Sequence, residues 1–168
     1  MLPYVVLFSH LVLIFIVLAI IFRDSWGRET VNFLGRHAVL LSLLVVLAAL
    51  VGSLFYSNVI GFAPCELCWW QRIFLYPQVI LFLTALKYKD SGVFKYAWRL
   101  SVLALVVSLY QVYIQLGGSS SLPCAAAGSA CAKIFVIAFG YITIPVMSLT
   151  VCVYLLLFAL SHRLSKNS

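Results

Sequence analysis

Five long apolar stretches, separated by short polar segments, run through this 168-residue chain. They cover residues 4–22, 38–60, 69–86, 100–116 and 134–160. Because an α-helix rises about 1.5 Å per residue, about 20 apolar residues cross the hydrocarbon core of a bilayer. Each stretch is therefore predicted to form a membrane helix. The first is expected to be retained, because no small-residue cleavage site of a signal peptide follows it.

Polar residues, glycines and prolines set the expected ends of these helices. We expect a polar linker at 23–37, a short basic loop at 87–99 and a loop rich in Gly, Ser and Ala at 117–133. Pro77 is expected to kink the third helix, which membrane helices tolerate. The last stretch is longer than one span needs, so its start is expected to lie along the membrane interface. Pro145 is expected to bend it.

The composition supports the membrane assignment. The chain is 65% apolar and 9% charged, whereas soluble domains are about half apolar and about a quarter charged. This excludes a soluble globular protein, and the length suits one all-α bundle in contact with membrane lipid. The net charge of +7 does not indicate a nucleic-acid partner. With so few charges, their position relative to the membrane is the more informative property.

The basic residues predict an orientation in the membrane. Nine of the eleven Lys and Arg residues lie in the first linker, the 87–99 loop and the C-terminal tail, while Arg72 and Lys133 lie on the opposite side. Cytoplasmic loops carry the excess of basic residues in membrane proteins. The N-terminus and four of the cysteines are therefore predicted to face the extracytoplasmic side, where disulfides form and persist.

Two cysteines in a C-x-x-C pattern precede the third stretch. Pro64 favours a helix start there, and a helix N-terminus lowers the pKa of a nearby thiol. A Cys65 placed just outside the first turn allows a disulfide to Cys68 with less strain. Arg72 follows Cys68 by four residues and shares its helix face. Its charge favours a thiolate at Cys68 and could polarise a carbonyl of an electron acceptor; an arginine that reaches lipid headgroups is the alternative.

Cys124 and Cys131 form a second pair in the 117–133 loop. This pair is either a staple of the loop or a mobile disulfide that exchanges with Cys65 and Cys68. Two pairs on one side of the membrane favour a relay. A four-cysteine zinc site and a purely structural disulfide are the alternatives. Cys152 lies in the middle of an apolar stretch and is expected to be a packing residue.

Two motifs resemble a known family. Residues 65–72, C-E-L-C-W-W-Q-R, resemble the C-x-x-C-x-x-x-R signature of the DsbB disulfide bond formation proteins, and are most similar to their short BdbC-type branch. Residues 140–145, G-Y-I-T-I-P, resemble that family's G-x-I-T-I-P stretch. The resemblance covers roughly residues 38–160. It implies a four-helix bundle in the bacterial cell membrane that reoxidises a DsbA-like thioredoxin-fold thiol oxidase. Electrons would pass to a membrane quinone, either ubiquinone or menaquinone.

The resemblance also implies roles for the cysteines and the arginine. Cys65 and Cys68 would be the pair next to the quinone, with Cys68 as the thiolate. Arg72 would be the cation beside the quinone. Cys124 and Cys131 would be the pair that faces the partner, with Cys124 as the site of the mixed disulfide. No metal ligands are implied.

The chain departs from the family pattern in three places. The 4–22 stretch is additional to the usual four helices, and the segment between the second pair of cysteines is short. Gln111 stands where some members carry a histidine near the end of the corresponding helix. Gln111, or Gln115, is therefore the candidate for a quinone contact there. Trp69 is expected to be an anchor in the interfacial aromatic belt, and could also flank a flat quinone ring.

These observations predict three regions. Residues 1–37 would form the extra helix and a cytoplasmic linker, 38–161 a DsbB-like four-helix bundle, and 162–168 a basic cytoplasmic tail. The alternative enzyme is a vitamin K epoxide reductase-like protein, in which the helix-borne C-x-x-C follows the loop pair instead of preceding it. The alternative from another class is a non-catalytic metal-binding or structural membrane protein.

Overall fold

The computed structural model describes residues 2–22, 27–118, 131 and 134–166. Five long helices account for most of this part of the chain: α1 (Leu2–Ile21), α2 (Gly27–Leu54), α3 (Glu66–Tyr88), α4 (Phe94–Gln115) and α5 (Ile144–Lys166). A π-helical turn, Phe55–Val59, extends α2, and a short 3₁₀ turn, Ser91–Val93, precedes α4. The prediction of an all-α membrane bundle with an additional first helix is confirmed.

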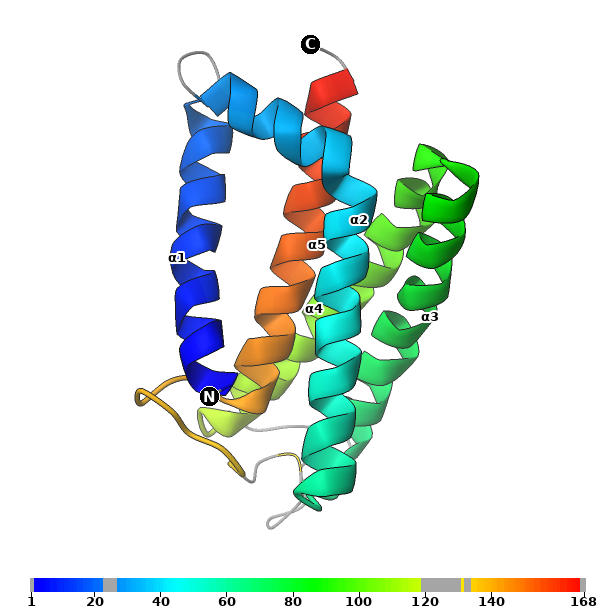
Figure 1. Ribbon diagram of the computed structural model, residues 1–168. Helices are drawn as coiled ribbons and strands as arrows, with labels where there is room; N and C mark the ends of the chain where they lie inside the picture. The colour runs from blue at the N-terminus through cyan, green and yellow to red at the C-terminus, as the bar shows by residue number, and fades with distance from the viewer. Residues whose placement is uncertain (1, 23–26, 119–130, 132–133, 167–168) are drawn as a thin grey trace.

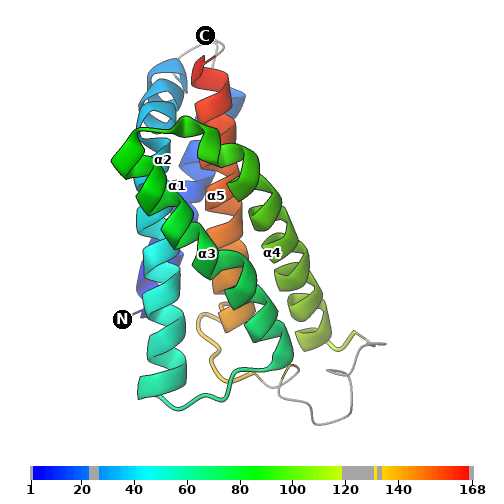
Figure 2. The same cartoon turned by 90° about the vertical axis from the view of Figure 1, so that its right-hand side faces the viewer.

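Helix α5 lies at the centre of the bundle. It packs against α2 and α4, while α3 packs against the same two helices from the other side. Figure 2 shows α3 and α4 side by side with α5 behind them. Helix α1 packs at the edge, against α2 and α5 (Figure 1). Apolar side chains between these helices form the main core, including Val46, Phe82, Ala104 and Phe158.

Helix α2 begins much earlier than predicted. Residues 27–37 were expected to be part of a polar linker, but they form the first third of α2. Val31, Leu34 and Ala38 are buried at a spacing of three and four residues, whereas Arg28 and Arg36 are exposed. This amphipathic pattern explains why a segment with several charges is helical. Figure 1 shows the first third of α2 crossing the end of the bundle before the helix turns down alongside α5.

The loop between α3 and α4 is shorter than predicted. Lys87 lies in the last turn of α3, and Lys95 and Arg99 lie in the first turns of α4. Within the described part of the chain, four helices are long and apolar enough to cross a membrane: α1, α2 with its π-helical turn, α4 with its 3₁₀ turn, and α5. Among the described helices α3 is less apolar, because it carries Gln71, Arg72 and other polar side chains. Helix α3 also contains Pro77 and continues past it to Tyr88.

Helix α5 begins later than predicted. The apolar residues 134–143 do not form the start of a helix; Phe139 and Gly140 have positive φ angles of 54° and 78° and turn the chain. Pro145 therefore lies in the first turn of α5 and does not bend it. A proline is well tolerated there, because the first turn has no carbonyl partner for its missing N–H.

The two ends of the bundle differ in charge. The start of α2, the end of α3, the start of α4 and the end of α5 lie together at one end (Figure 1). The basic residues at that end are Arg28, Arg36, Lys87, Lys89, Lys95, Arg99, Arg163 and Lys166. Helix α3 begins at the opposite end, so the C-x-x-C pair lies far from this basic cluster. The described chain is therefore a multi-pass helical membrane protein with the basic end separated from the cysteines.

Candidate active site

The C-x-x-C pair lies at the start of α3, as predicted. Cys65 is the residue before the helix, in an extended conformation (φ −76°, ψ 171°), and its sulfur accepts a hydrogen bond from the backbone N–H of Cys68 at 3.4 Å. The two Sγ atoms are 2.9 Å apart, and both thiols are free. The prediction that Cys65 stands just outside the first turn is confirmed. This position lets the two sulfurs approach more closely than two residues within a regular helix.

A pair of buried glutamines contacts the sulfurs from α3 and α4. The side-chain amide nitrogen of Gln111 lies 3.3 Å from the Cys65 sulfur and 3.5 Å from the Cys68 sulfur. Gln71 donates a hydrogen bond of 2.8 Å to the amide oxygen of Gln111. Because this bond occupies the oxygen, it directs the NH₂ group of Gln111 toward the cysteines. The structure places the Gln111 amide against the two sulfurs, and a contact of Gln111 with a quinone stays a prediction.

This environment favours a thiolate at Cys68. Cys68 lies just before the apolar part of α3, which starts at Trp69. The hydrogen bond with the Cys65 thiol is the largest cause that lowers the pKa of Cys68 to about 6; burial opposes it, and Gln111 and the charge of Arg72 lower the pKa further. The same bond raises the pKa of Cys65. The pair is therefore arranged as one thiolate and one thiol that donates to it.

Arg72 lies on the same face of α3 as Cys68, as predicted. Its guanidinium donates to the hydroxyl oxygen of Ser53 at 3.0 Å and to the backbone carbonyl of Ser53 at 3.2 Å. The guanidinium carbon lies 5.2 Å from the centre of the Trp69 ring, which places the cation over the ring face. Trp69 itself is 54% exposed and is not among the residues that line the cavity described next. Arg72 is thus fixed by α2 and covered by Trp69.

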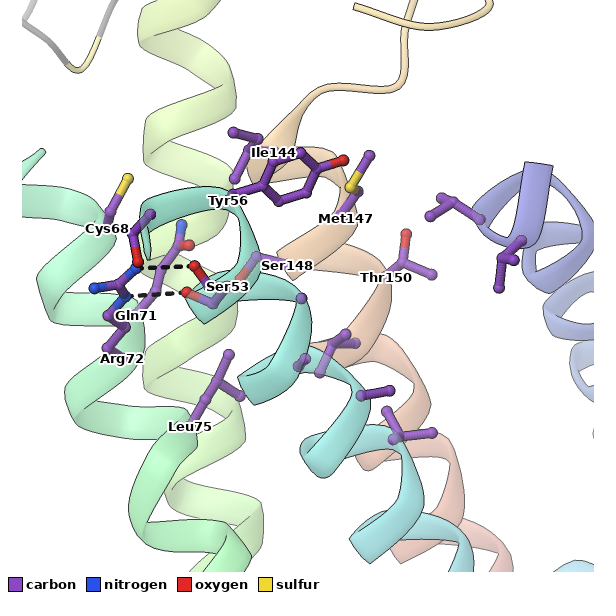
Figure 3. Close-up of a pocket in the computed structure, with 18 of the residues that line it drawn as sticks. Ser53, Tyr56, Cys68, Gln71, Arg72, Leu75, Ile144, Met147, Ser148 and Thr150 are labelled. Atoms are coloured by element: carbon purple, nitrogen blue, oxygen red, sulfur yellow. Dashed lines mark hydrogen bonds between the residues drawn. The ribbon is translucent and has the colours of Figure 1, made fainter. Parts of the chain in front are cut away.

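A cavity of about 530 Å³ begins at Cys68 and extends between α1, α2, α3 and α5. Ser53, Cys68, Gln71 and Arg72 meet at one end of the cavity (Figure 3). Other polar side chains, among them Ser148 and Thr150, line it farther from Cys68. The rest of the lining is mostly apolar and includes Leu75 and other aliphatic side chains of α1, α2 and α5. Small-molecule sites are typically about 300–1,000 Å³, apolar, with a few placed polar groups.

Aromatic rings from three segments contact one another at the cavity. Tyr56, in the π-helical turn after α2, stacks with Phe62 at 6.1 Å between ring centres, and Phe62 stacks with Phe135 at 5.0 Å. All three residues line the cavity. Single π-helical turns are often found at functional sites. Here the turn brings Tyr56 to the cavity beside Ile144 and Met147 (Figure 3).

One member of the second cysteine pair lies beside the first pair. Cys131 is buried, is disulfide-bonded, and packs in one apolar cluster with Cys65, Leu67 and Ile114. Cys124 lies outside the described residues. Cys65 belongs to the cluster of Cys131, whereas Cys68 packs against that cluster and also lines the cavity.

Two residues of the site were missed in the sequence. Gln71 is a buried polar residue next to Arg72, and Ser53 holds the guanidinium from α2. A polar side chain inside an apolar helix is a signal that could have identified Gln71. Ser53 carried no such signal, because serine is common in membrane helices. Cys152 is fully buried in the main core, as expected for a packing residue.

Comparisons with known proteins agree with the geometry. Residues 35–162 match the family described as "Disulfide bond formation protein DsbB". The chain is 44% identical, over 68% of its length and 76% of the relative, to "SPbeta prophage-derived disulfide bond formation protein B" of Bacillus subtilis (strain 168). It is 35% identical, over 70% of its length and 86% of the relative, to "Disulfide bond formation protein C" of the same organism. No solved structure matches the chain significantly.

Proposed function

The chain belongs to the DsbB family of disulfide bond formation proteins, and from this premise we propose that it is a membrane thiol:quinone oxidoreductase. The observation that carries the proposal is the position of Cys68. Its sulfur contacts the Cys65 thiol and the Gln111 amide, which lower its pKa, and it opens onto a mostly apolar cavity beside Arg72. A redox-active sulfur at the edge of such a cavity suits an apolar electron acceptor.

In the proposed reaction, electrons pass through both cysteine pairs. A thiolate of a DsbA-like, thioredoxin-fold thiol oxidase attacks Cys124 of the Cys124–Cys131 disulfide and forms a mixed disulfide. The second partner thiol resolves it, so the partner leaves oxidised and the chain holds two thiols. These thiols then reduce the Cys65–Cys68 disulfide by the same exchange. The shared apolar cluster of Cys65 and Cys131 supports a direct exchange between the pairs.

The cavity residues fit a quinone. Oxidation of the Cys65 and Cys68 thiols to a disulfide releases two electrons and two protons, which a quinone, ubiquinone or menaquinone, takes up to become the quinol. Arg72, fixed by Ser53, presents a positive charge to a carbonyl oxygen at that end of the cavity. Gln111 stabilises the Cys68 thiolate, and the mostly apolar lining limits access of water. Trp69 would shield the guanidinium of Arg72 from lipid rather than contact the ring.

The charge distribution supports an orientation in the bacterial cell membrane. The basic end of the bundle would lie in the cytoplasm, and the C-x-x-C end would lie on the extracytoplasmic side. Electrons from partners in the oxidising compartment would then reach the quinone without crossing the bilayer. The three predicted regions, 1–37, 38–161 and 162–168, are retained in this proposal, with 27–37 as helix rather than linker.

The Cys68→Ser substitution tests the proposed function. We expect the purified variant to fold but to lose reduction of quinone, because the sulfur at the cavity is absent. The assay follows quinone absorbance with a reduced thioredoxin-fold oxidase as electron donor. Cys152→Ser is the matched control and should retain activity, since Cys152 lies in the packed core. Quinone turnover by Cys68→Ser at the wild-type rate would refute the proposal. Stoichiometric zinc in the wild-type protein, with no redox-active thiols, would instead favour the metal-binding alternative.

A further inference from the structure

Helix α1 has no counterpart in the matched family region, which begins at residue 35. Yet it contributes to the wall of the cavity that starts at Cys68. Val5, Val6, Phe8, Ser9 and Val12 all line it. Figure 3 shows side chains of α1 facing the cavity from the side opposite Cys68 and Arg72. The cavity is therefore not confined to the residues of the family region.

Polar contacts fix α1 against α5 at this level. Apart from Tyr4, the polar side chains between residues 4 and 22 are Ser9 and His10, and they are adjacent. Tyr154 of α5 donates its hydroxyl to the backbone carbonyl of Ser9. The Nε2 atom of His10 lies 2.9 Å from the hydroxyl of Thr150. Polar groups at membrane depth are costly unless they are paired, so these contacts indicate that α1 has one defined position.

The hydrogen-bond roles of the two ring nitrogens of His10 follow from its neighbours. Thr150 donates its hydroxyl to the carbonyl of Val146 at 2.9 Å, so it accepts from Nε2 of His10. The Nδ1 atom then accepts from the hydroxyl of Tyr141, 3.4 Å away. The wall of the cavity is thus held by a hydrogen-bonded network joining α1, α5 and the segment before α5.

We propose that α1 completes a second subsite of the cavity, which binds the prenyl chain of the quinone while the ring lies beside Cys68. The inference rests on the proposed function. Three features support a prenyl chain as the occupant. Arg72, the one charged side chain among the lining residues, lies at the Cys68 end, and the lining is continuous from there to α1. The rest of the lining is mostly apolar, and the hydroxyls of Ser9, Thr150 and Tyr154 at the α1 end are bonded to backbone carbonyls of the protein.

Substitutions on two faces of α1 test this subsite. Val12 lines the cavity, whereas the adjacent Leu11 is 62% exposed and does not. Val12→Trp should fill the subsite, and Leu11→Trp is the control with the same added ring. Val6→Phe, also at the cavity, is a milder second variant in case Val12→Trp does not fold. Retention of the wild-type thermal unfolding midpoint would confirm folding of each variant.

The quantity to measure is the affinity for quinones rather than the rate of quinone reduction. Dissociation constants for menadione, which has no tail, and for a menaquinone with a prenyl chain are obtained with fully oxidised, detergent-solubilised full-length protein, by quenching of tryptophan fluorescence. A benzoquinone pair, with and without a prenyl chain, is measured in parallel. We expect the preference for the prenylated quinone to fall at least about tenfold in Val12→Trp, as for other crowded apolar pockets. It should be unchanged in Leu11→Trp.

The outcomes separate the two proposals. If the wild-type protein binds and reduces quinones but shows no preference for the prenyl chain, or if Val12→Trp and Val6→Phe leave that preference unchanged, the subsite is refuted and the proposed function stands. A lipid acyl chain would then be the occupant of the α1 end. If the wild-type protein neither binds nor reduces any quinone, both proposals fail.

Discussion

Gln71 and Gln78 are two buried glutamines of α3, seven residues apart, that face α4. Both are hydrogen-bonded, but to different kinds of partner. Gln78 donates to the carbonyl of Phe74 in its own helix at 3.1 Å and accepts from the Ser101 hydroxyl at 3.2 Å. Gln71 bonds to Gln111, whose NH₂ group then lies against the two cysteine sulfurs. The Gln78 contacts stay within the α3–α4 pair, whereas the Gln71 contacts extend to the redox pair.

The comparison shows that burial of a polar side chain in a membrane helix does not by itself identify a functional residue. Both glutamines are almost fully buried, and both are hydrogen-bonded. The two differ in the group that their hydrogen bonds finally reach. Gln78 bonds only to groups of α3 and α4, so it is expected to contribute to the free energy of unfolding. The Gln71–Gln111 pair presents an N–H to a thiolate, so it is expected to act on the pKa of Cys68.

The largest change in the pKa of Cys68 is expected for Gln111→Leu. Leucine removes a hydrogen bond to the Cys68 thiolate, and bonds to charged groups contribute about 1.5–3 kcal/mol. At about 1.4 kcal/mol per pKa unit, the pKa of Cys68 should rise by about one to two units. In the wild-type protein Cys68 is mainly thiolate above pH 6 and mainly thiol below it. Alkylation of reduced protein, followed by mass spectrometry across pH 5–9, should therefore show its midpoint move upward. An unchanged midpoint would contradict the role given to Gln111.

A smaller effect is expected for Gln71→Leu. Gln71 does not contact the sulfurs; it orients the amide of Gln111 through the 2.8 Å bond. Without that bond the Gln111 amide can rotate, so the pKa of Cys68 should rise by less than about one unit. The same alkylation titration measures it. A shift as large as that of Gln111→Leu would mean that orientation by Gln71 accounts for the entire contribution of Gln111.

Gln78→Leu is expected to have the smallest effect, and to change the free energy of unfolding rather than the pKa of Cys68. Hydrogen bonds between membrane helices contribute about 0.6 kcal/mol on average. The free energy of unfolding in mixed micelles should fall by about that amount, while the Cys68 alkylation midpoint stays at its wild-type value. A midpoint shifted as in Gln111→Leu would show that the two glutamine sites are coupled. The contrast between them would then not hold.

Local sequence patterns predicted the parts of the site that lie within one helix. Pro64 placed the start of α3, and the three- and four-residue spacings placed Cys65, Cys68 and Arg72 on one face. Hydropathy located the five helices. Several helix ends were wrong, most of all the starts of α2 and α5, because hydropathy was read by composition alone. The charged start of α2 is amphipathic rather than a linker, and the apolar residues before Ile144 turn at Gly140.

Contacts between helices could not be predicted from the sequence. The bond from Gln71 to Gln111 joins residues forty positions apart, and it depends on how α3 and α4 pack. The bond from Arg72 to Ser53 likewise depends on the packing of α2 against α3. The position of α1 depends on a contact between His10 and Thr150, which are 140 residues apart. No periodicity in a single stretch carries information about such pairs.

The first third of α2 fixes the depth of the bundle in the bilayer. Gly35 lies so close to α5 that an added Cβ atom would come within 2.5 Å of the Ser165 side chain, and His162 donates to the Gly35 carbonyl at 3.1 Å. Because Arg28 and Arg36 lie on the exposed face of this segment, we expect it to stay at the headgroups when the bilayer thins or thickens. Because α2 continues from this segment to Ser53, which bonds to Arg72, we expect the height of Arg72 to depend on where the basic end lies in the bilayer. The distance of the C-x-x-C end from the membrane surface would then depend on the thickness of the bilayer.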